Sequence, residues 1–247
     1  MEKPRIAGII PARFGSSRFP GKPLALIGNK TMIEWTYSRV IKSHLLDEVI
    51  VATDDKRIFD EVKRFGAQVV MTSSKHSSGT DRIIEVLQNK KDIELVVNIQ
   101  GDEPGIEIEL IEGVIRQKLE HRDWEMSTAA CLMKEDEYGD PNRVKVVFSQ
   151  TGQALYFSRS LIPSNHKSKV PVYRHLGLYC YEKEALLQYS SLPESKLEQS
   201  ESLEQLRGLD HGYRIGIFVT DNAALSVDSP EDLKLLISDF KQKGLIN

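Results

Sequence analysis

Short apolar runs alternate with helix-patterned segments through the first half of the chain. The strand-like runs are residues 5–10, 49–52, 68–71 and 94–99. The segments with helical periodicity or helix caps are 31–43, 56–65, 80–87 and 108–119. Four consecutive strand–loop–helix units predict an α/β fold, in which a parallel, doubly wound sheet is covered by helices.

Ligands of such sheets bind beyond the carboxyl ends of the strands. The sequence becomes polar and rich in glycine at four such places, namely 11–22, 53–55, 72–80 and 100–104. Because these stretches all follow predicted strands, we expect them to meet in one site.

The second half of the chain has a more mixed pattern. Strand-like runs at 144–148 and 153–157 flank the turn at Thr151 and Gly152, which predicts antiparallel edge strands. The remaining expected elements are strands at 126–131, 175–181 and 213–219, a helix over 197–209, and a final helix from Pro230 to about Lys243. Since no linker divides the sequence, we expect one domain over residues 1–247.

Composition narrows the possible functions. The net charge of −3 does not suggest a general binder of nucleic acid or of membrane surfaces. Cys131 and Cys180 have no metal-type spacing, and the sequence has neither a signal-like segment nor an apolar run of membrane-spanning length. A cytoplasmic protein with a small anionic ligand is the expectation.

The loop at residues 9–23 is the first candidate for that ligand. It combines two glycines and two serines with three cations, Arg13, Arg18 and Lys22, directly after a buried strand. Backbone N–H groups and cations in such a loop bind phosphate oxygens. The loop is not a Walker A motif, because it is one residue too long and Pro23 replaces the Ser or Thr. The alternative is a basic surface loop.

Two carboxylates follow strand-like segments elsewhere in the chain. Asp102 lies in a Gly-Asp-Glu-Pro turn, and Asp228 follows Leu225-Ser226-Val227. If both face the same crevice, they can hold Mg²⁺ beside the basic loop, since this ion prefers one or two carboxylates together with phosphate oxygens. The alternatives are a turn residue for Asp102 and a helix N-cap for Asp228.

Polar side chains of the second half could form a substrate pocket. Arg159 could bind a carboxylate in bidentate fashion, or form a salt bridge at the rim. His175 and Tyr179 share a strand face and could bind hydroxyl groups, although His175 could equally be structural. Glu201, Glu204 and Gln205 share one face of the expected helix, with a solvated face as the alternative.

Together the motifs resemble one family, the cytidylyltransferases that activate 3-deoxy-D-manno-octulosonate (Kdo). The segments that carry the resemblance are 10–23, 51–54, 71–72, 78–82, 98–104, 154–159, 174–179, 203–207 and 227–232. They extend over essentially the whole chain and occur in the family's order.

The resemblance implies the reaction of CTP with Kdo to give CMP-Kdo and pyrophosphate, a step toward the lipopolysaccharide core. It also implies a Mg²⁺-dependent homodimer with the three-layer, Rossmann-like nucleotidyltransferase fold. Residues 1–125 would mainly bind the nucleotide, and residues 126–220 would mainly bind the sugar and form the antiparallel, dimerising part.

The resemblance also assigns roles to individual residues. Arg13, Arg18 and Lys22 would hold the triphosphate, and Asp102 and Asp228 would hold Mg²⁺, with Arg13, Lys22 and both aspartates as the catalytic group. The cytidine pocket would comprise Met71, Thr72, Ser78, Gly79 and Thr80. The contacts to the sugar acid would come from Gln100, Arg159, His175, Tyr179, Glu204 and Gln205.

One position departs from the family pattern. Ser226 stands where many members have glycine, directly before the Val-Asp pair. This resembles a subgroup that uses 8-amino-8-deoxy-Kdo, so the same reaction on that sugar is an alternative. Other acidic sugars, such as a sialic acid, and a non-catalytic nucleotide-binding protein are further alternatives.

Overall fold

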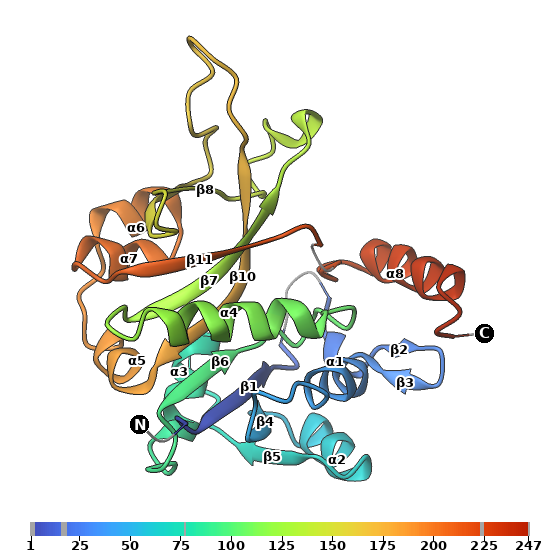
Figure 1. The fold of residues 1–247 in the computed structure, drawn as a ribbon. Helices are drawn as coiled ribbons and strands as arrows, with labels where there is room; N and C mark the ends of the chain where they lie inside the picture. The colour runs from blue at the N-terminus through green and yellow to red at the C-terminus, as the bar shows by residue number, and fades with distance from the viewer. Residues whose placement is uncertain (1–2, 16–18, 77, 223–224, 247) are drawn as a thin grey trace. The chain divides into compact units, whose positions relative to one another are not determined.

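The computed structural model describes residues 3–15, 19–76, 78–222 and 225–246 (Figure 1). The chain divides into two compact units. The first unit comprises Met1–Ile111 and Ala224–Asn247, and the second comprises Glu112–Ala223. The assignment of nucleotide binding to residues 1–125 and sugar binding to 126–220 stays a prediction.

Four parallel strands form the sheet of the first unit. Their order is β6 (Leu95–Asn98), β1 (Ile6–Ala12), β4 (Glu48–Thr53) and β5 (Gln68–Met71). Ile6, Ile9 and Ile10 of the central strand β1 are fully buried, as expected for a strand covered on both faces. The chain passes from β1 to β4 and β5 on one side and then to β6 on the other, so the strand order reverses beside β1.

The helices of this unit begin at the caps that the sequence provides. They are α1 (Met32–Val40), α2 (Lys56–Arg64), α3 (Gly79–Leu87) and α8 (Pro230–Gln242), while α4 (Ile108–Glu120) continues into the second unit. Thr31, Asp55, Ser78 and Ser229 are the N-caps, and each side chain accepts a backbone N–H of the first turn.

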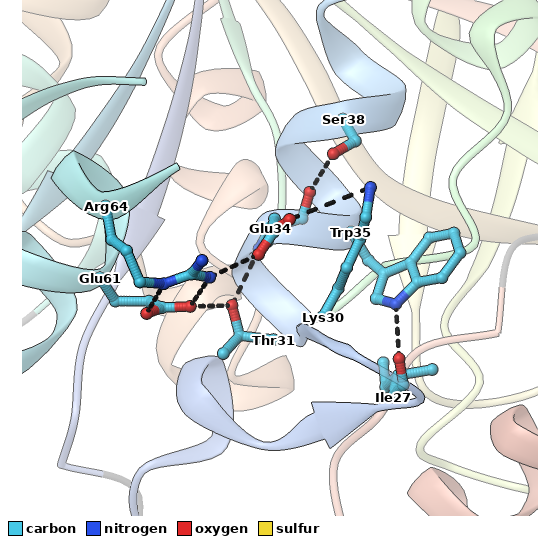
Figure 2. Close-up of polar contacts among 8 residues, drawn as sticks. All are labelled: Ile27, Lys30, Thr31, Glu34, Trp35, Ser38, Glu61 and Arg64. Atoms are coloured by element: carbon cyan, nitrogen blue, oxygen red, sulfur yellow. Dashed lines mark hydrogen bonds and ion pairs between the residues drawn. The ribbon is translucent and has the colours of Figure 1, made fainter. Parts of the chain in front are cut away.

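Helix α8 packs against the start of α1 and a small hairpin of β2 (Leu26–Ile27) and β3 (Lys30–Thr31), which follows the short 3₁₀ helix η1 (Lys22–Leu24). Ile27, Val227 and Phe240 belong to the shared apolar cluster. The Trp35 ring meets Phe240 edge-on at 5.0 Å, and its Nε1 donates to the Ile27 carbonyl at 2.8 Å (Figure 2). The apolar cluster thus fixes the segments that precede α8 and follow Lys22.

A polar network at the start of α1 links this helix to α2 (Figure 2). Arg64 donates to Glu34 at 2.7 Å and to Glu61 at 2.8 Å, and Thr31 Oγ1 donates to Glu61 at 2.9 Å. Arg64 holds the pKa of the Glu61 carboxyl below its usual value. Because Arg64 is largely exposed, its ion pairs are screened by water and contribute little to stability.

The second unit contains mainly antiparallel pairs. The strands β9 (Ala154–Ser158), β8 (Lys145–Phe148), β10 (Tyr173–Glu182) and β7 (Met126–Leu132) pair in that order, and β11 (Ile215–Thr220) pairs in parallel with β7. Gly152 has a φ of 81° at the predicted hairpin turn. The expected α/β class, with a mostly parallel sheet and an antiparallel subregion, is confirmed.

The prediction of one helix over residues 197–209 is wrong. The segment forms two short helices, α6 (Lys196–Glu201) and α7 (Gln205–Asp210), separated at Ser202, which has a φ of 51°. A residue in the left-handed backbone conformation ends an α-helix. Glycine is the usual residue there, so a serine is a weaker sequence signal for a helix end. Helix α5 (Lys183–Tyr189) and the 3₁₀ helix η2 (Glu135–Glu137) were not predicted from the sequence. Among the described residues, no helix is long and apolar enough to cross a membrane.

Candidate active site

A cavity of about 250 Å³ lies in the first unit, where the strand order reverses beside β1. Its walls come from the ends of β1 and β6, the loop after β5, the start of α3, η1 and the segment before α8. The lining residues are Pro11, Ala12, Arg13, Lys22, Pro23, His76, Ser78, Gly79, Arg82, Gln100, Gly101, Asp102 and Asp228. The predicted meeting of the 11–22, 72–80 and 100–104 loops is confirmed.

Two close backbone approaches bring these loops together. A Cβ added to Gly101 would lie 3.0 Å from the carbonyl oxygen of Pro11, so glycine lets the ends of β1 and β6 meet. The Val227 N–H donates to the carbonyl oxygen of Asp102 at 3.0 Å. This bond places Asp228 next to Asp102, although the two residues are far apart in sequence.

Lys22 and the two aspartates form a single charge cluster. The Lys22 Nζ atom donates to Asp102 Oδ2 at 2.5 Å and to Asp228 Oδ1 at 3.4 Å. The N-cap alternative for Asp228 is wrong, because Ser229 caps α8 and its side chain accepts the Asp232 N–H. The Asp228 carboxylate therefore takes part in a cluster on the cavity wall.

The donor set of this cluster fits a magnesium ion. Two carboxylates from different loops already share one cationic group, and Mg²⁺ takes one or two carboxylates together with substrate phosphates. Among the described residues, no group of three or more His, Cys, Asp or Glu side chains is arranged to hold a metal. Two carboxylates alone suit an ion that also binds substrate oxygens and water.

The basic loop closes on itself beside the cavity. Gly21 has a φ of 72°, and its N–H donates to the Phe14 carbonyl at 2.9 Å. The Arg57 guanidinium covers the Phe14 ring at 3.3 Å from its centroid. Arg13 lines the cavity as expected. Arg18, the third predicted cation, lies outside the described residues.

Helix α3 directs its N-terminus toward the cavity. Ser78 and Gly79 line the cavity at the first turn, where backbone N–H groups and the helix dipole favour an anion. Of the other residues expected at the cytidine, Thr72 and Thr80 are buried and Met71 is exposed at the end of β5. None of these three lines the cavity.

Arg82 and His76 are two cavity residues for which the sequence pattern predicts no role. Arg82 is almost fully buried on α3, donates to Thr72 Oγ1, and pairs with Asp54 at 2.9 Å. The polar stretch at 53–55 thus reaches the cavity indirectly, through Asp54 and Arg82. Arg82 is the last residue of the 78–82 motif. Its position one turn into α3 was the sequence signal that could have identified it as a residue of the site.

In the second unit, His175 and Tyr179 lie on one face of β10, as predicted. Their rings are 5.4 Å apart, and the Tyr179 ring stacks on Tyr181 at 5.5 Å. The pairing of β10 with β7 shifts by two residues after Leu176, which preserves the alternation of faces. Thr128 lies at this irregularity.

Thr128 fixes the tautomer of His175. Its hydroxyl lies 3.0 Å and 2.7 Å from the carbonyl oxygens of Leu176 and Leu178, which compete for its single proton, and 3.0 Å from His175 Nε2. Because the hydroxyl proton is directed to the carbonyls, Nε2 must carry a proton and donate to Thr128. Burial lowers the pKa of His175 to about 3, with Arg174 adding to the shift. The ring is therefore neutral at pH 7.

Arg159 holds backbone groups in this structure. Its guanidinium donates to the carbonyls of Glu201 at 2.6 Å, Pro141 at 3.0 Å and Ser202 at 3.1 Å. The Glu201 carboxylate accepts from Ser158 Oγ at 2.7 Å and from the Arg159 N–H at 2.8 Å. Glu201 is thus not on a solvated helix face, and both residues fasten the end of α6 to β9.

Glu204 and Gln205 differ in their surroundings because α7 begins between them. Glu204 is the exposed N-cap, and its carbonyl accepts a hydrogen bond from the Tyr189 hydroxyl, whereas Gln205 is buried. Burial raises the pKa of Tyr179, with a smaller contribution from the Glu204 carboxylate. The shared helix face predicted for Glu201, Glu204 and Gln205 does not exist, because α6 ends before Glu204.

The fold and the cavity define a nucleotidyltransferase, and the comparison with protein families narrows the class. A model described as cytidylyltransferase matches residues 7–216. A protein of Leptospira interrogans serovar Lai named 3-deoxy-manno-octulosonate cytidylyltransferase is 58% identical over 244 residues, which cover 98% of this chain and 99% of the relative. A protein of the same name from Leptospira biflexa is 54% identical over 243 residues, with 98% and 99% coverage.

A solved structure gives the same result. The CMP:2-keto-3-deoxy-manno-octonic acid synthetase complexed with CTP has a TM-score of 0.94 and 39% identity, and the match covers 97% of this chain and 99% of that one. A 4-diphosphocytidyl-2C-methyl-D-erythritol synthase from Anaerococcus prevotii, at 16% identity and a TM-score of 0.67, shares the fold alone. The chain belongs to the 3-deoxy-manno-octulosonate cytidylyltransferase family, which confirms the resemblance seen in its motifs.

Proposed function

We propose that this chain transfers the cytidylyl group of CTP to the anomeric hydroxyl of Kdo. The sugar oxygen forms a bond to the α-phosphorus while the bond from the α-phosphorus to the bridging oxygen breaks, so CMP-Kdo and pyrophosphate form and the hydroxyl proton is lost. The observation that carries the proposal is the cluster of Lys22, Asp102 and Asp228 in an anion-binding cavity of a chain from this family. The product would serve synthesis of the lipopolysaccharide core.

The residues of the cavity supply charge and position. Displacement at phosphorus needs alignment of the reactants and neutralisation of the phosphate oxygens more than it needs a covalent intermediate. Arg13, Lys22 and the N-terminus of α3 would hold the triphosphate, and Lys22 would stabilise the charge that builds up as pyrophosphate leaves. Gln100, beside Asp102 on the same wall, would face the incoming sugar.

Asp102 and Asp228 would hold Mg²⁺. When bound, the ion would neutralise charge on the triphosphate and its leaving group. We also propose that the protein acts as a homodimer in the cytoplasm, as the family resemblance implies. The two carboxylates lie on the cavity wall and both contact the Lys22 ammonium, so they are close enough together to hold one ion. This arrangement supports the metal assignment.

In the second unit, His175, Tyr179 and Glu204 would bind the sugar. A neutral His175 with its proton on Nε2 leaves Nδ1 as a hydrogen-bond acceptor for a sugar hydroxyl. Arg159 would orient the site by holding the end of α6, because three of its N–H groups already serve backbone carbonyls. We propose Kdo as the substrate rather than its 8-amino form, since the relatives described above are named for Kdo.

Pyrophosphate release from CTP and Mg²⁺ tests this function, with Kdo, 8-amino-Kdo and N-acetylneuraminic acid assayed in parallel. We expect turnover with Kdo and far less with the other two sugars. If no 3-deoxy-ulosonic acid gives pyrophosphate release, the proposal is overturned.

Two variants test the roles of the carboxylates. Asp102→Asn and Asp228→Asn should each lower turnover by several orders of magnitude while the fold survives, because each removes half of the anionic donor pair. Asp60→Asn is the matched control, since Asp60 makes an exposed ion pair with Lys56 on α2, away from the lining of the cavity. Wild-type turnover in either active-site variant would remove the metal assignment.

A further inference from the structure

His76 lines the cavity beside the start of α3, and no step of the reaction above uses it. Its side chain is about a quarter exposed, and the Nε2 atom forms a hydrogen bond with the Glu85 carboxylate on α3. The position is polar, within reach of a ligand, and outside the charge cluster of Lys22, Asp102 and Asp228.

Two side chains of α3 hold the loop that carries His76. Glu85 Oε2 accepts the Ser73 N–H at 2.9 Å as well as the bond from His76. Arg82, one turn earlier on the helix, donates to Thr72 Oγ1. Because both ends of the 72–76 segment are tied to the same helix, the His76 ring is held in one orientation.

The partner on Nε2 determines what the other ring nitrogen can do. The Ser73 N–H and the hydrogen bond from His76 lower the pKa of the Glu85 carboxyl, so this group is an ionised acceptor at neutral pH. An acceptor-only partner requires the proton of a neutral imidazole to be on Nε2. The Nδ1 atom is then an acceptor, and the ligand group that matches it is an N–H or O–H donor.

We propose that His76 is a specificity-determining residue for the nucleotide, and that its Nδ1 accepts a hydrogen bond from a donor of the nucleoside part of CTP. The inference rests on the proposed function. Two kinds of donor have this chemistry: the exocyclic amino group of cytosine, which uracil lacks, and the ribose hydroxyls. Glu85 is the positioning residue, because it fixes the tautomer and the ring orientation.

Two substitutions separate the contact from the tether. His76→Gln places an amide nitrogen near the position of Nε2, so it can keep the bond to Glu85 but offers no acceptor at the position of Nδ1. His76→Asn places its amide near the position of Nδ1 and loses Glu85. Thermal unfolding of both variants checks that the fold survives, and Glu85→Gln, which keeps a neutral acceptor, completes the set.

The measurement is the dissociation constant for nucleotide in the presence of Mg²⁺ and the absence of sugar, for CTP, UTP, 2′-deoxy-CTP and 3′-deoxy-CTP. We expect His76→Gln to weaken CTP binding about tenfold, as the loss of one hydrogen bond implies. His76→Asn should lose less. The analogue that lacks the bonded donor should bind equally to wild type and His76→Gln, and this identifies the amino group or the hydroxyl.

Two results would overturn the proposal. One is unchanged CTP binding in His76→Gln. The other is an equal loss for all four nucleotides that disappears above about pH 8, because this pattern describes a protonated His76 bonded to phosphate. If wild-type protein binds CTP but releases no pyrophosphate with any sugar, the proposed function fails while the role of His76 in binding can still be decided.

Discussion

Replacement of Lys22 by Met is expected to change the protein's response to magnesium. The change removes the ammonium group that lies 2.5 Å from Asp102 and 3.4 Å from Asp228, while it keeps most of the apolar stem. Each contact represents a gross Coulomb attraction of roughly 5–7 kcal/mol at an effective dielectric constant of about 20. Because the Asp228 side chain is 46% exposed, we discount that pair to about 0.5–1 kcal/mol.

The Asp102 pair is less exposed, and its attraction is offset by the cost of removing Lys22 from water. We therefore expect Lys22→Met to lower the free energy of unfolding by about 1–3 kcal/mol in the presence of a chelator. Addition of Mg²⁺ should restore part of this loss, since the ion can bind the two carboxylates without competition from the ammonium. At ten times the dissociation constant, binding stabilises the folded state by about 1.4 kcal/mol.

Urea unfolding of wild type and Lys22→Met, each with and without Mg²⁺ and without nucleotide, measures both quantities. Lys56→Met serves as the control for loss of an exposed lysine, and Lys22→Met combined with Asp102→Asn should lose the Mg²⁺ effect. In pyrophosphate release, Lys22→Met should mainly lower kcat. Equal stabilisation of wild type and variant by Mg²⁺ would refute the reasoning that the ammonium and the ion share the same carboxylates.

Two further predictions concern the cavity and the second unit. Gly101→Ala should cost about 1–3 kcal/mol of stability and reduce kcat, because the new methyl group would lie 3.0 Å from the Pro11 carbonyl next to Asp102; unchanged urea unfolding and turnover would contradict this. His175 should make stability fall as the pH drops from about 6.5 toward 3, because its folded pKa of about 3 is depressed and the unfolded chain binds the extra proton. His175→Gln should remove this part of the slope in urea unfolding at pH 7, 6 and 5, and an unchanged slope would show that the ring is not held neutral.

The sequence predicted the framework of the site because strand ends are visible in a sequence. Buried parallel strands give continuous apolar runs, and the turn to polar and glycine-rich residues marks the edge where ligands bind. Thus Arg13, Gly101 and Asp102 could be placed at one edge of the sheet from the pattern alone. Residues 68–71, one of the two shortest expected strands of the first half, match β5 in full.

Other parts of the site depend on contacts between residues far apart in the sequence, which a local sequence pattern cannot predict. Asp228 and Ser229 are both good N-cap residues, and long-range contacts such as the bond from the Val227 N–H to the Asp102 carbonyl bring Asp228 to the cavity. Arg159 carries the same charge whether it binds a substrate or a backbone carbonyl. Its partners depend on where α6 ends. Helix α6 ends at Ser202, which has a left-handed backbone conformation that the sequence did not predict.

The hydrogen bond between Val227 and Asp102 joins two segments that are synthesised at different times, and this determines when the site can assemble. The first unit is discontinuous, since its sheet comes from the first 111 residues and its last part begins at residue 224. A ribosome therefore delivers Asp102 before the second unit and Asp228 after it. A nascent chain that already contains β6 still lacks one of the two carboxylates, so the charge cluster forms only after the second unit has also been synthesised.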